Sequence, residues 1–213
     1  MRVIVPIHFE ERTNSISHGI GIVLSIIGLI VMLPIASLHG DAWRIISTSI
    51  YCGSLVLLYS ISTLYHSVKS PKINNILKIL DHSSIYLLIA GSYTPFVLVN
   101  FRGAWGWSMF GVVWGIAFFG IIFKVFINNH IEWVSTLLYV IMGWLIVITQ
   151  APIAEVLDWY GFIWLLVGGL FYTGGVAFFT YDRIPYFHTI WHVFVILGSL
   201  CHYYAIMMYV LPI

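Results

Sequence analysis

Charged residues are scarce in this sequence: Asp, Glu, Lys and Arg make up 8% of the 213 residues, whereas 61% are hydrophobic. A soluble domain needs roughly 25% charged residues for its surface, so the composition excludes a soluble protein and indicates an integral membrane protein. The few basic residues are dispersed and the formal net charge is +1. No basic patch therefore supports a nucleic-acid partner.

The sequence contains only two cysteines, and its first residues do not have the pattern of a signal peptide. Cys52 and Cys201 both lie inside apolar runs, where a small buried hydrophobic residue is a better interpretation than half of a disulfide. Residues 1–15 contain Glu10 and Glu11 and lack a short apolar core followed by small residues. We therefore expect no removable signal peptide, and the first apolar stretch should remain in the mature protein.

Apolar stretches long enough to cross a membrane account for nearly the whole chain. A bilayer core needs about 20 helical residues per crossing, and seven stretches qualify: 17–38, 43–67, 76–99, 104–126, 131–150, 159–180 and 185–211. Pro95 should kink the third of these. The sequence thus predicts an all-α protein in which residues 1–213 form a single seven-helix transmembrane domain, as expected of a multi-pass protein of the cell membrane.

The basic residues predict the orientation of this bundle. With the N-terminus in the cytoplasm, seven of them fall on the cytoplasmic side: Arg2, Arg12, Lys69, Lys72, Lys78, Lys124 and Arg183. The other side holds only Arg44 and Arg102. Because Lys and Arg are enriched in cytoplasmic loops, we expect a cytoplasmic N-terminus and an extracytoplasmic C-terminus.

Several ionisable side chains then fall at one depth of the membrane. His66 ends the second stretch, Asp81 lies in the first turns of the third, and His188 and His192 lie in the first turns of the last. At 1.5 Å per residue, all four lie within roughly 10 Å of the cytoplasmic interface. Residues far apart in the sequence should therefore meet in one layer.

Three imidazoles in this layer match the ligands of a catalytic zinc ion. His188 and His192 are four residues apart, so both rings lie on one face of a helix, and His66 supplies a third ligand while water takes a fourth position. Zinc lowers the pKa of bound water to about 7 and polarises a carbonyl, as hydrolysis of an amide or ester requires. Asp81 could take a proton from that water or orient a ligand, and Ser62, one turn before His66, could bind the water or an oxyanion. A substrate that reaches this layer from the inner leaflet would be a lipid or a long acyl chain.

Simpler interpretations exist for each of these residues. His188 and His192 could form hydrogen bonds between helices, Asp81 could pair with Lys78 or favour a helix N-terminus, and Ser62 could serve helix packing. Three further histidines and some glycines fit such roles better than chemistry. His18 and His82 are expected to lie at the interface or to support the ligands. His202 lies about 21 Å beyond His188 and should form a hydrogen bond to a neighbouring helix. Glycines should let helices approach closely: Gly111, Gly115, Gly168, Gly169, Gly174 and Gly175.

Four motifs resemble those of a known family. They are NSISHGIG at 14–21, SISTLYH at 60–66, DHSSIYLLIAGSYTP at 81–95 and FHTIWH at 187–192. In this order they resemble the hemolysin III family, the bacterial branch related to the progestin and adipoQ receptors. The resemblance spans nearly the whole chain and implies seven helices, a cytoplasmic N-terminus and zinc bound by His66, His188 and His192, with Ser62 and Asp81 nearby. Because the wider superfamily includes alkaline ceramidases, the resemblance also favours metal-dependent lipid hydrolysis.

Three functions remain open on the sequence alone. The first is a zinc-dependent lipid hydrolase, or a sensor derived from one, with a role in membrane-lipid homeostasis that the family resemblance suggests. The second is a pore-forming or haemolytic protein, as the family label implies, although no amphipathic segment is suited to conversion from a soluble to an inserted form. The third is a receptor-like regulator in which zinc only joins the helices.

Overall fold

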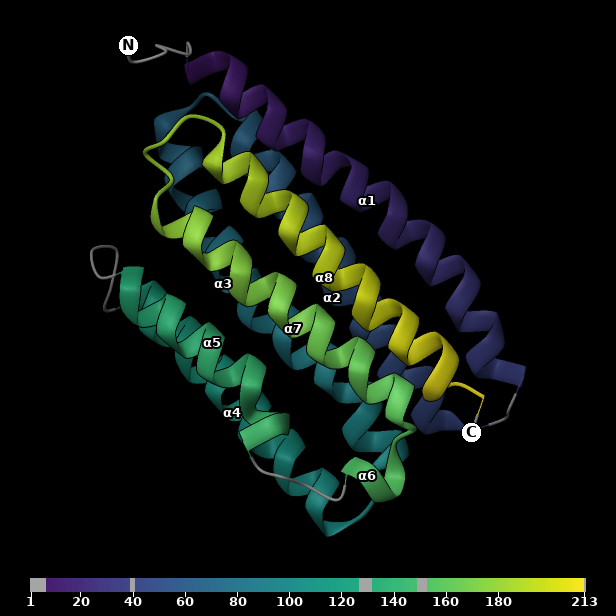
Figure 1. Cartoon of the computed structure of the whole chain (residues 1–213). Coiled ribbons are helices and arrows are strands. Elements are labelled where there is room, and N and C mark those ends of the chain that lie inside the picture. The colour runs from purple at the N-terminus through teal and green to yellow at the C-terminus, as the bar shows by residue number, and fades with distance from the viewer. Residues whose placement is uncertain (1–6, 39–40, 127–131, 149–152, 213) are drawn as a thin grey trace.

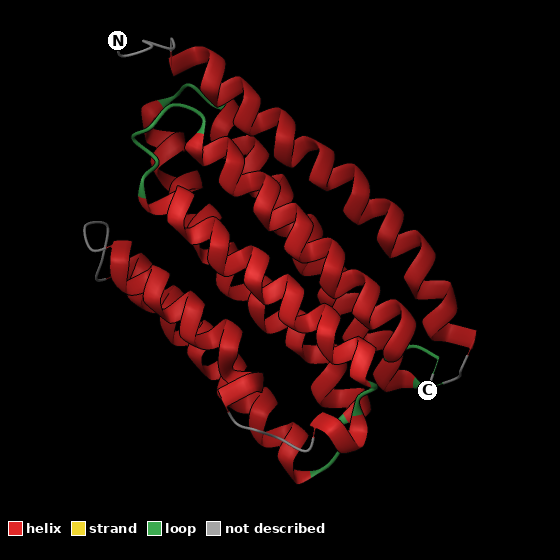
Figure 2. Cartoon of the chain, in the orientation of Figure 1, coloured by secondary structure: helices red, strands yellow, loops and turns green. Residues whose placement is uncertain are grey.

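The protein is a bundle of long helices. In the computed structural model, which describes residues 7–38, 41–126, 132–148 and 153–212, these residues form helices joined by turns and contain no strand (Figure 2). Figure 1 labels the α-helices: α1 (Ile7–Leu38), α2 (Ala42–Ser67), α3 (Pro71–Pro95), α4 (Ala104–Phe126), α5 (Glu132–Ile148), α6 (Ile153–Val156), α7 (Trp159–Thr180) and α8 (Phe187–Tyr209).

The predicted all-α transmembrane class is confirmed. Six helical segments are long and apolar enough to cross a membrane: α1, α2, α3 with its extension to Asn100, α4, α7 and α8. The predicted stretch 131–150 corresponds to α5, a shorter apolar helix of 17 residues, and the ends of that stretch lie outside the described residues. Six candidate spans and one shorter apolar helix therefore form the bundle.

Two helices begin earlier than the apolar pattern predicted. α1 starts at Ile7 rather than at 17, and α3 starts at Pro71 rather than at 76. Hydropathy marks only the part of a helix that suits lipid, whereas helical hydrogen bonds continue through polar turns. Pro71 is well placed at the start of α3, because the first turn of a helix does not need its missing N–H.

Pro95 marks a change of helix type. The α-helical part of α3 ends there, and the chain continues as a π-helix, η1 (Phe96–Asn100), in which the Phe101 amide donates to the Phe96 carbonyl at 3.0 Å. Proline cannot donate a helical hydrogen bond and its ring crowds the preceding turn, so the ladder is rearranged at this position. The change of helix type thus falls at the proline where the sequence predicted a kink.

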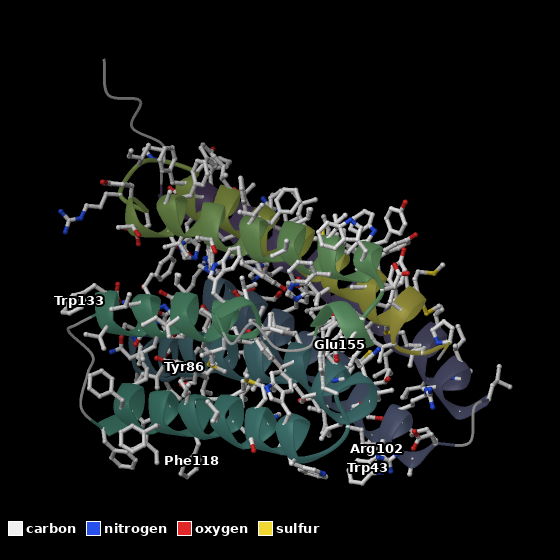
Figure 3. All side chains as sticks on the ribbon, turned by 60° about the horizontal axis from the view of Figure 1, so that its bottom comes forward. Trp43, Tyr86, Arg102, Phe118, Trp133 and Glu155 are labelled. Atoms are coloured by element: carbon white, nitrogen blue, oxygen red, sulfur yellow. The ribbon has the colours of Figure 1, made fainter. Side chains whose placement is uncertain are left out.

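The second half of α3, from Asp81 to Pro95, lies inside the bundle and is largely buried. Small residues allow its neighbours to approach: the Tyr86 ring packs directly on Gly120 of α4. α7 approaches α8 in the same way, because Gly168 faces His202 and Gly175 faces Trp191. α4 instead exposes large apolar residues, among them Phe118, which points away from the bundle in Figure 3.

The helix ends gather at two ends of the bundle. The starts of α1, α3, α5 and α8 lie at one end, together with the last turns of α2, α4 and α7 (Figure 1). This end therefore carries His66, Asp81, His188 and Lys124, whereas Arg44 and Arg102 lie at the other end. Residues that the sequence placed in one layer do share one end of the fold.

Candidate metal centre

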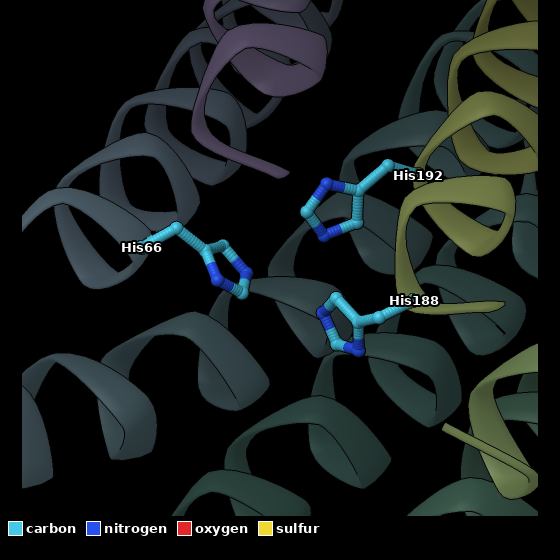
Figure 4. Close-up of side chains that lie close together, drawn as sticks. All are labelled: His66, His188 and His192. Carbon is cyan, nitrogen blue, oxygen red and sulfur yellow. The ribbon is translucent and has the colours of Figure 1, made fainter. Parts of the chain in front are cut away.

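Three histidines meet where α2 ends and α8 begins. His66 lies in the last turn of α2, and His188 and His192 lie one above the other in the first turns of α8. One ring nitrogen from each lies within 4.8 Å of those of the other two, so the rings face a common centre (Figure 4). We call these three residues the histidine triad.

The start of α8 is held by α1. Tyr186, just before α8, has a φ of 66°, a left-handed conformation that is uncommon for a residue other than glycine. Its amide donates to the Glu10 carboxylate at 2.9 Å, and the Thr189 hydroxyl donates to the Asn14 side chain. These bonds fix where the helix begins and therefore which face carries the two histidines.

α1 also binds the outer ring nitrogens of two triad members. His66 Nδ1 lies 2.7 Å from the Glu11 carboxylate. His192 Nδ1 lies 2.9 Å from the Ser17 hydroxyl and 3.2 Å from the Asn14 carbonyl. Such partners fix the orientation of an imidazole ring and raise its basicity as a ligand.

The inner nitrogens fit a metal ion. His66 Nε2 is buried without a hydrogen-bond partner in the described part of the chain, and the bonds to His192 Nδ1 leave Nε2 of that ring for a ligand. A buried nitrogen without a partner is costly unless something binds it. Three imidazoles with no thiolate suit zinc, which takes three protein ligands and keeps one open position in catalytic sites.

Asp81 and Ser62 lie beside the triad without belonging to it. Asp81 is buried in α3, close enough to His66 for their charges to interact, and the Ser62 hydroxyl lies beside its carboxylate. Both residues line the same cavity as His192. A carboxylate and a hydroxyl therefore face the space next to the three imidazoles.

That cavity is long and largely apolar. Its volume is about 980 Å³ including its opening, and its polar residues at one end include Ser62, Asp81 and His192. Its walls come from six helices, α1, α2, α3, α5, α7 and α8, and contain mainly aliphatic and aromatic residues, among them Leu58, Leu88, Val140, Val176 and Val195. The shape and lining suit a long apolar chain with a polar head at the triad.

His18, His82 and His202, the other histidines considered in the sequence analysis, take three different positions. The His18 ring stacks on His192 with centroids 3.5 Å apart, and neither of its nitrogens has a partner among the described residues. His82 lies outside the triad, edge-on to Phe179. His202 lines the cavity away from the triad and lies 3.3 Å from the Leu165 carbonyl of α7, the bond between helices that the sequence suggested.

Sequence reasoning assigned no role to Glu11, Asn14 and Ser17 of α1, which bind the triad, and considered only His18 as a supporting residue. Glu11, Asn14 and His18 are three and four residues apart, so they lie on one face of the helix. A polar face on a helix that otherwise exposes apolar residues was the signal that could have identified them. Glu11 lies outside the stretch predicted as the first crossing, which is why its contact with His66 was missed.

Comparisons with known proteins agree with the motifs. A model of the family described as "Haemolysin-III related" matches residues 7–203. The chain is 47% identical to "Hemolysin-3" of Bacillus cereus over 95% of its own length and 93% of that protein. It is 42% identical to "Hemolysin-3 homolog" of Bacillus subtilis (strain 168), over 94% of each protein.

A human protein is also similar over nearly the whole chain. "Monocyte to macrophage differentiation factor" of Homo sapiens is 31% identical over 96% of this chain and 86% of that protein. The matches cover α1, the three histidines and Asp81 together, so the likeness extends over the helices that form the site as well as the rest of the bundle. This chain is a multi-pass membrane protein that belongs to the haemolysin III family.

Proposed function

We propose that the protein is a zinc-dependent hydrolase that cleaves an amide or ester bond of a membrane lipid. The observation that carries this proposal is the histidine triad, whose ring nitrogens converge beside an apolar cavity that His192 and the buried Asp81 carboxylate line. A site that only joined helices would not need the carboxylate or the cavity. Turnover of membrane lipid would also give the protein a role in lipid homeostasis.

Each residue of the site has a part in this chemistry. His66, His188 and His192 would hold zinc as neutral imidazoles, with Glu11 and Ser17 keeping two of the rings in place. When bound, zinc would supply a Lewis acid that activates water and polarises a carbonyl group.

Asp81 and Ser62 would act on the proton and the oxygen of the reacting groups. The Asp81 carboxylate would accept the proton of the attacking water and later pass it to the leaving group. The Ser62 hydroxyl would donate a hydrogen bond to that carboxylate or to the carbonyl oxygen of the substrate.

The cavity favours a lipid as substrate. Apolar side chains of α3, α5 and α7 surround a space that would remove an acyl chain from contact with lipid and water. Each buried methylene contributes about 0.8 kcal/mol to binding. The polar head of the lipid would then lie at the triad, near the end of the bundle that we propose faces the cytoplasm.

Metal content and lipid turnover test this proposal together. Purified protein should contain about one zinc per chain and should release fatty acid from a total lipid extract, as measured by elemental analysis and mass spectrometry. His192→Ala should lose both zinc and product. Asp81→Asn should keep zinc and lose about 100-fold to 10,000-fold in rate, as expected for removal of a general base. His202→Gln, outside the triad, serves as the control for zinc content.

Release of fatty acid by metal-free protein would rule out a zinc-dependent hydrolase. Zinc that raises thermal stability, with no product from any lipid class, would instead support a receptor-like protein in which the metal joins α2 to α8.

The names of the two Bacillus relatives favour a second candidate, a membrane-perturbing protein. Under that alternative, purified protein would release dye from liposomes, and His66→Ala would release as much as the unchanged protein.

A further inference from the structure

A second polar pocket lies where α3, α4 and α5 meet at the end of the bundle that carries the triad. Its lining consists of Asn75, Lys78, Ile79, Lys124 and Glu132, and its volume is about 550 Å³ including its opening. It shares no lining residue with the long cavity described above. The proposed hydrolysis makes no use of it.

Lys124 is the unusual residue of this pocket. It lies in the last turn of α4 and is only 2% exposed. Lys78 donates to Glu132 at 2.8 Å, whereas no carboxylate of the described residues lies within ion-pair distance of Lys124. Burying an ammonium is costly when no carboxylate of the described residues lies within ion-pair distance, so an anion that binds beside Lys124 would gain from its charge.

The surrounding charges leave the pocket positive. The turn between α7 and α8 adds Asp182, whose charge interacts with Glu132, Lys78 and Arg183. The region contains three cationic side chains and two carboxylates, and its net charge is therefore +1: the cations are Lys78, Lys124 and Arg183, and the carboxylates are Glu132 and Asp182. A lysine that offsets the partial charge at a helix end, or that marks the cytoplasmic side of the membrane, can do so with its amine in water, as the exposed Lys72 does. Neither role therefore requires that Lys124 be buried.

Exposed aromatic and apolar residues place the pocket at the depth of lipid headgroups. Trp133 follows Glu132 directly and is 66% exposed, pointing outward at the end of the bundle opposite Arg102 (Figure 3). Tryptophan is enriched where the membrane meets water. Exposed Ile76 and Leu80 of α3 and Phe126 of α4 offer apolar surface for acyl chains close to the pocket.

We propose that this pocket binds the phosphate of an anionic glycerophospholipid, with Lys124 as the main contact and Asn75 as a further donor. Basic pockets between transmembrane helices are suited to such headgroups. The lipid would fill the space between α3, α4 and α5 at the interface. It would be a bound partner at a site distinct from the triad.

Lipid selectivity tests the proposal. Native mass spectrometry of purified full-length protein would compare retention of phosphatidylglycerol with that of phosphatidylcholine of the same acyl chains. We expect the unchanged protein to prefer phosphatidylglycerol, Lys124→Met to lose about fivefold of that preference, and Lys124→Arg to keep it. Lys72→Met is the matched control, because Lys72 is exposed at the same end of the bundle, and it should behave as the unchanged protein does.

Two results would overturn the assignment. Equal selectivity in Lys124→Met and in Lys72→Met would show that the pocket does not distinguish phosphatidylglycerol from phosphatidylcholine. Displacement of phosphatidylglycerol by inorganic phosphate at equal concentration would show a site for free phosphate rather than for a lipid. Melting temperatures of the variants in phosphatidylcholine alone separate lost binding from lost folding.

Discussion

Glu11 and Ser17 each contact the outer nitrogen of a histidine in the triad, at 2.7 Å and 2.9 Å. The histidines themselves were predictable, because the helical rise gives the depth of each residue in the membrane and the spacing of four gives a shared face. Their partners were not, since the direction in which α1 turns its polar face depends on how it packs against α2 and α8. The sequence therefore predicted the inner residues of the site better than the outer ones.

Removal of the Glu11 carboxylate should weaken metal binding. Glu11→Gln leaves an amide in place of the charge that orients His66, so we expect zinc affinity to fall about 10-fold to 100-fold. Competition with a chelating dye measures this change. Glu10→Gln is the matched control: the glutamine oxygen can still accept the bond from the Tyr186 amide, and no histidine of the described residues forms a hydrogen bond or ion pair with Glu10. Equal affinity in both variants would show that the Glu11 contact has no part in metal binding.

At the scale of elements, close approach between helices decides which glycines matter. The sequence treated the glycine pairs of α4 and α7 alike. In the structure, a Cβ at Gly175 would lie 2.7 Å from the Trp191 ring of α8, whereas a Cβ at Gly111 would meet nothing within 4 Å among the described residues. The difference depends on which face of each helix has a neighbour, and glycine spacing alone carries no such information.

Gly175→Ala should therefore destabilise the bundle. The added methyl group overlaps the Trp191 ring, and overpacking of this kind costs about 1–3 kcal/mol. Gly111→Ala adds the same group to an open face of α4, where alanine is the better helix former. Thermal unfolding in detergent should show a lower midpoint for the first variant and an unchanged or higher midpoint for the second. A drop of equal size in both would contradict the packing of α7 on α8.

At the scale of the whole molecule, the two ends of the bundle differ in charge. Arg12, Lys69, Lys72, Lys78, Lys124 and Arg183 lie at the end that carries the triad, and Arg44 and Arg102 lie at the other. Arg102 stacks over Trp43 with its guanidinium 5.2 Å from the ring centroid, as suits a residue at an interface. This asymmetry supports the proposed orientation, in which the triad end faces the cytoplasm.

Labelling of introduced cysteines tests this orientation. Both native cysteines are buried, so background labelling should be low. In intact cells, a membrane-impermeant maleimide should react with Arg102→Cys and should spare Lys72→Cys until the cells are opened. The reverse pattern would place the triad on the outer side of the membrane and its substrate in the outer leaflet.

The sequence by itself determined the membrane environment, the helical class and the shared end of the bundle where His66, Asp81, His188 and His192 lie, because these follow from composition and from a constant rise per residue. The tertiary structure decided which side chains touch. It added α1 to the triad through Glu11 and Ser17, enclosed the apolar cavity and buried Lys124 between α3, α4 and α5. The reason is physical: hydropathy and spacing fix the position of a residue along its helix, whereas the rotation of each helix about its axis is set by packing against its neighbours.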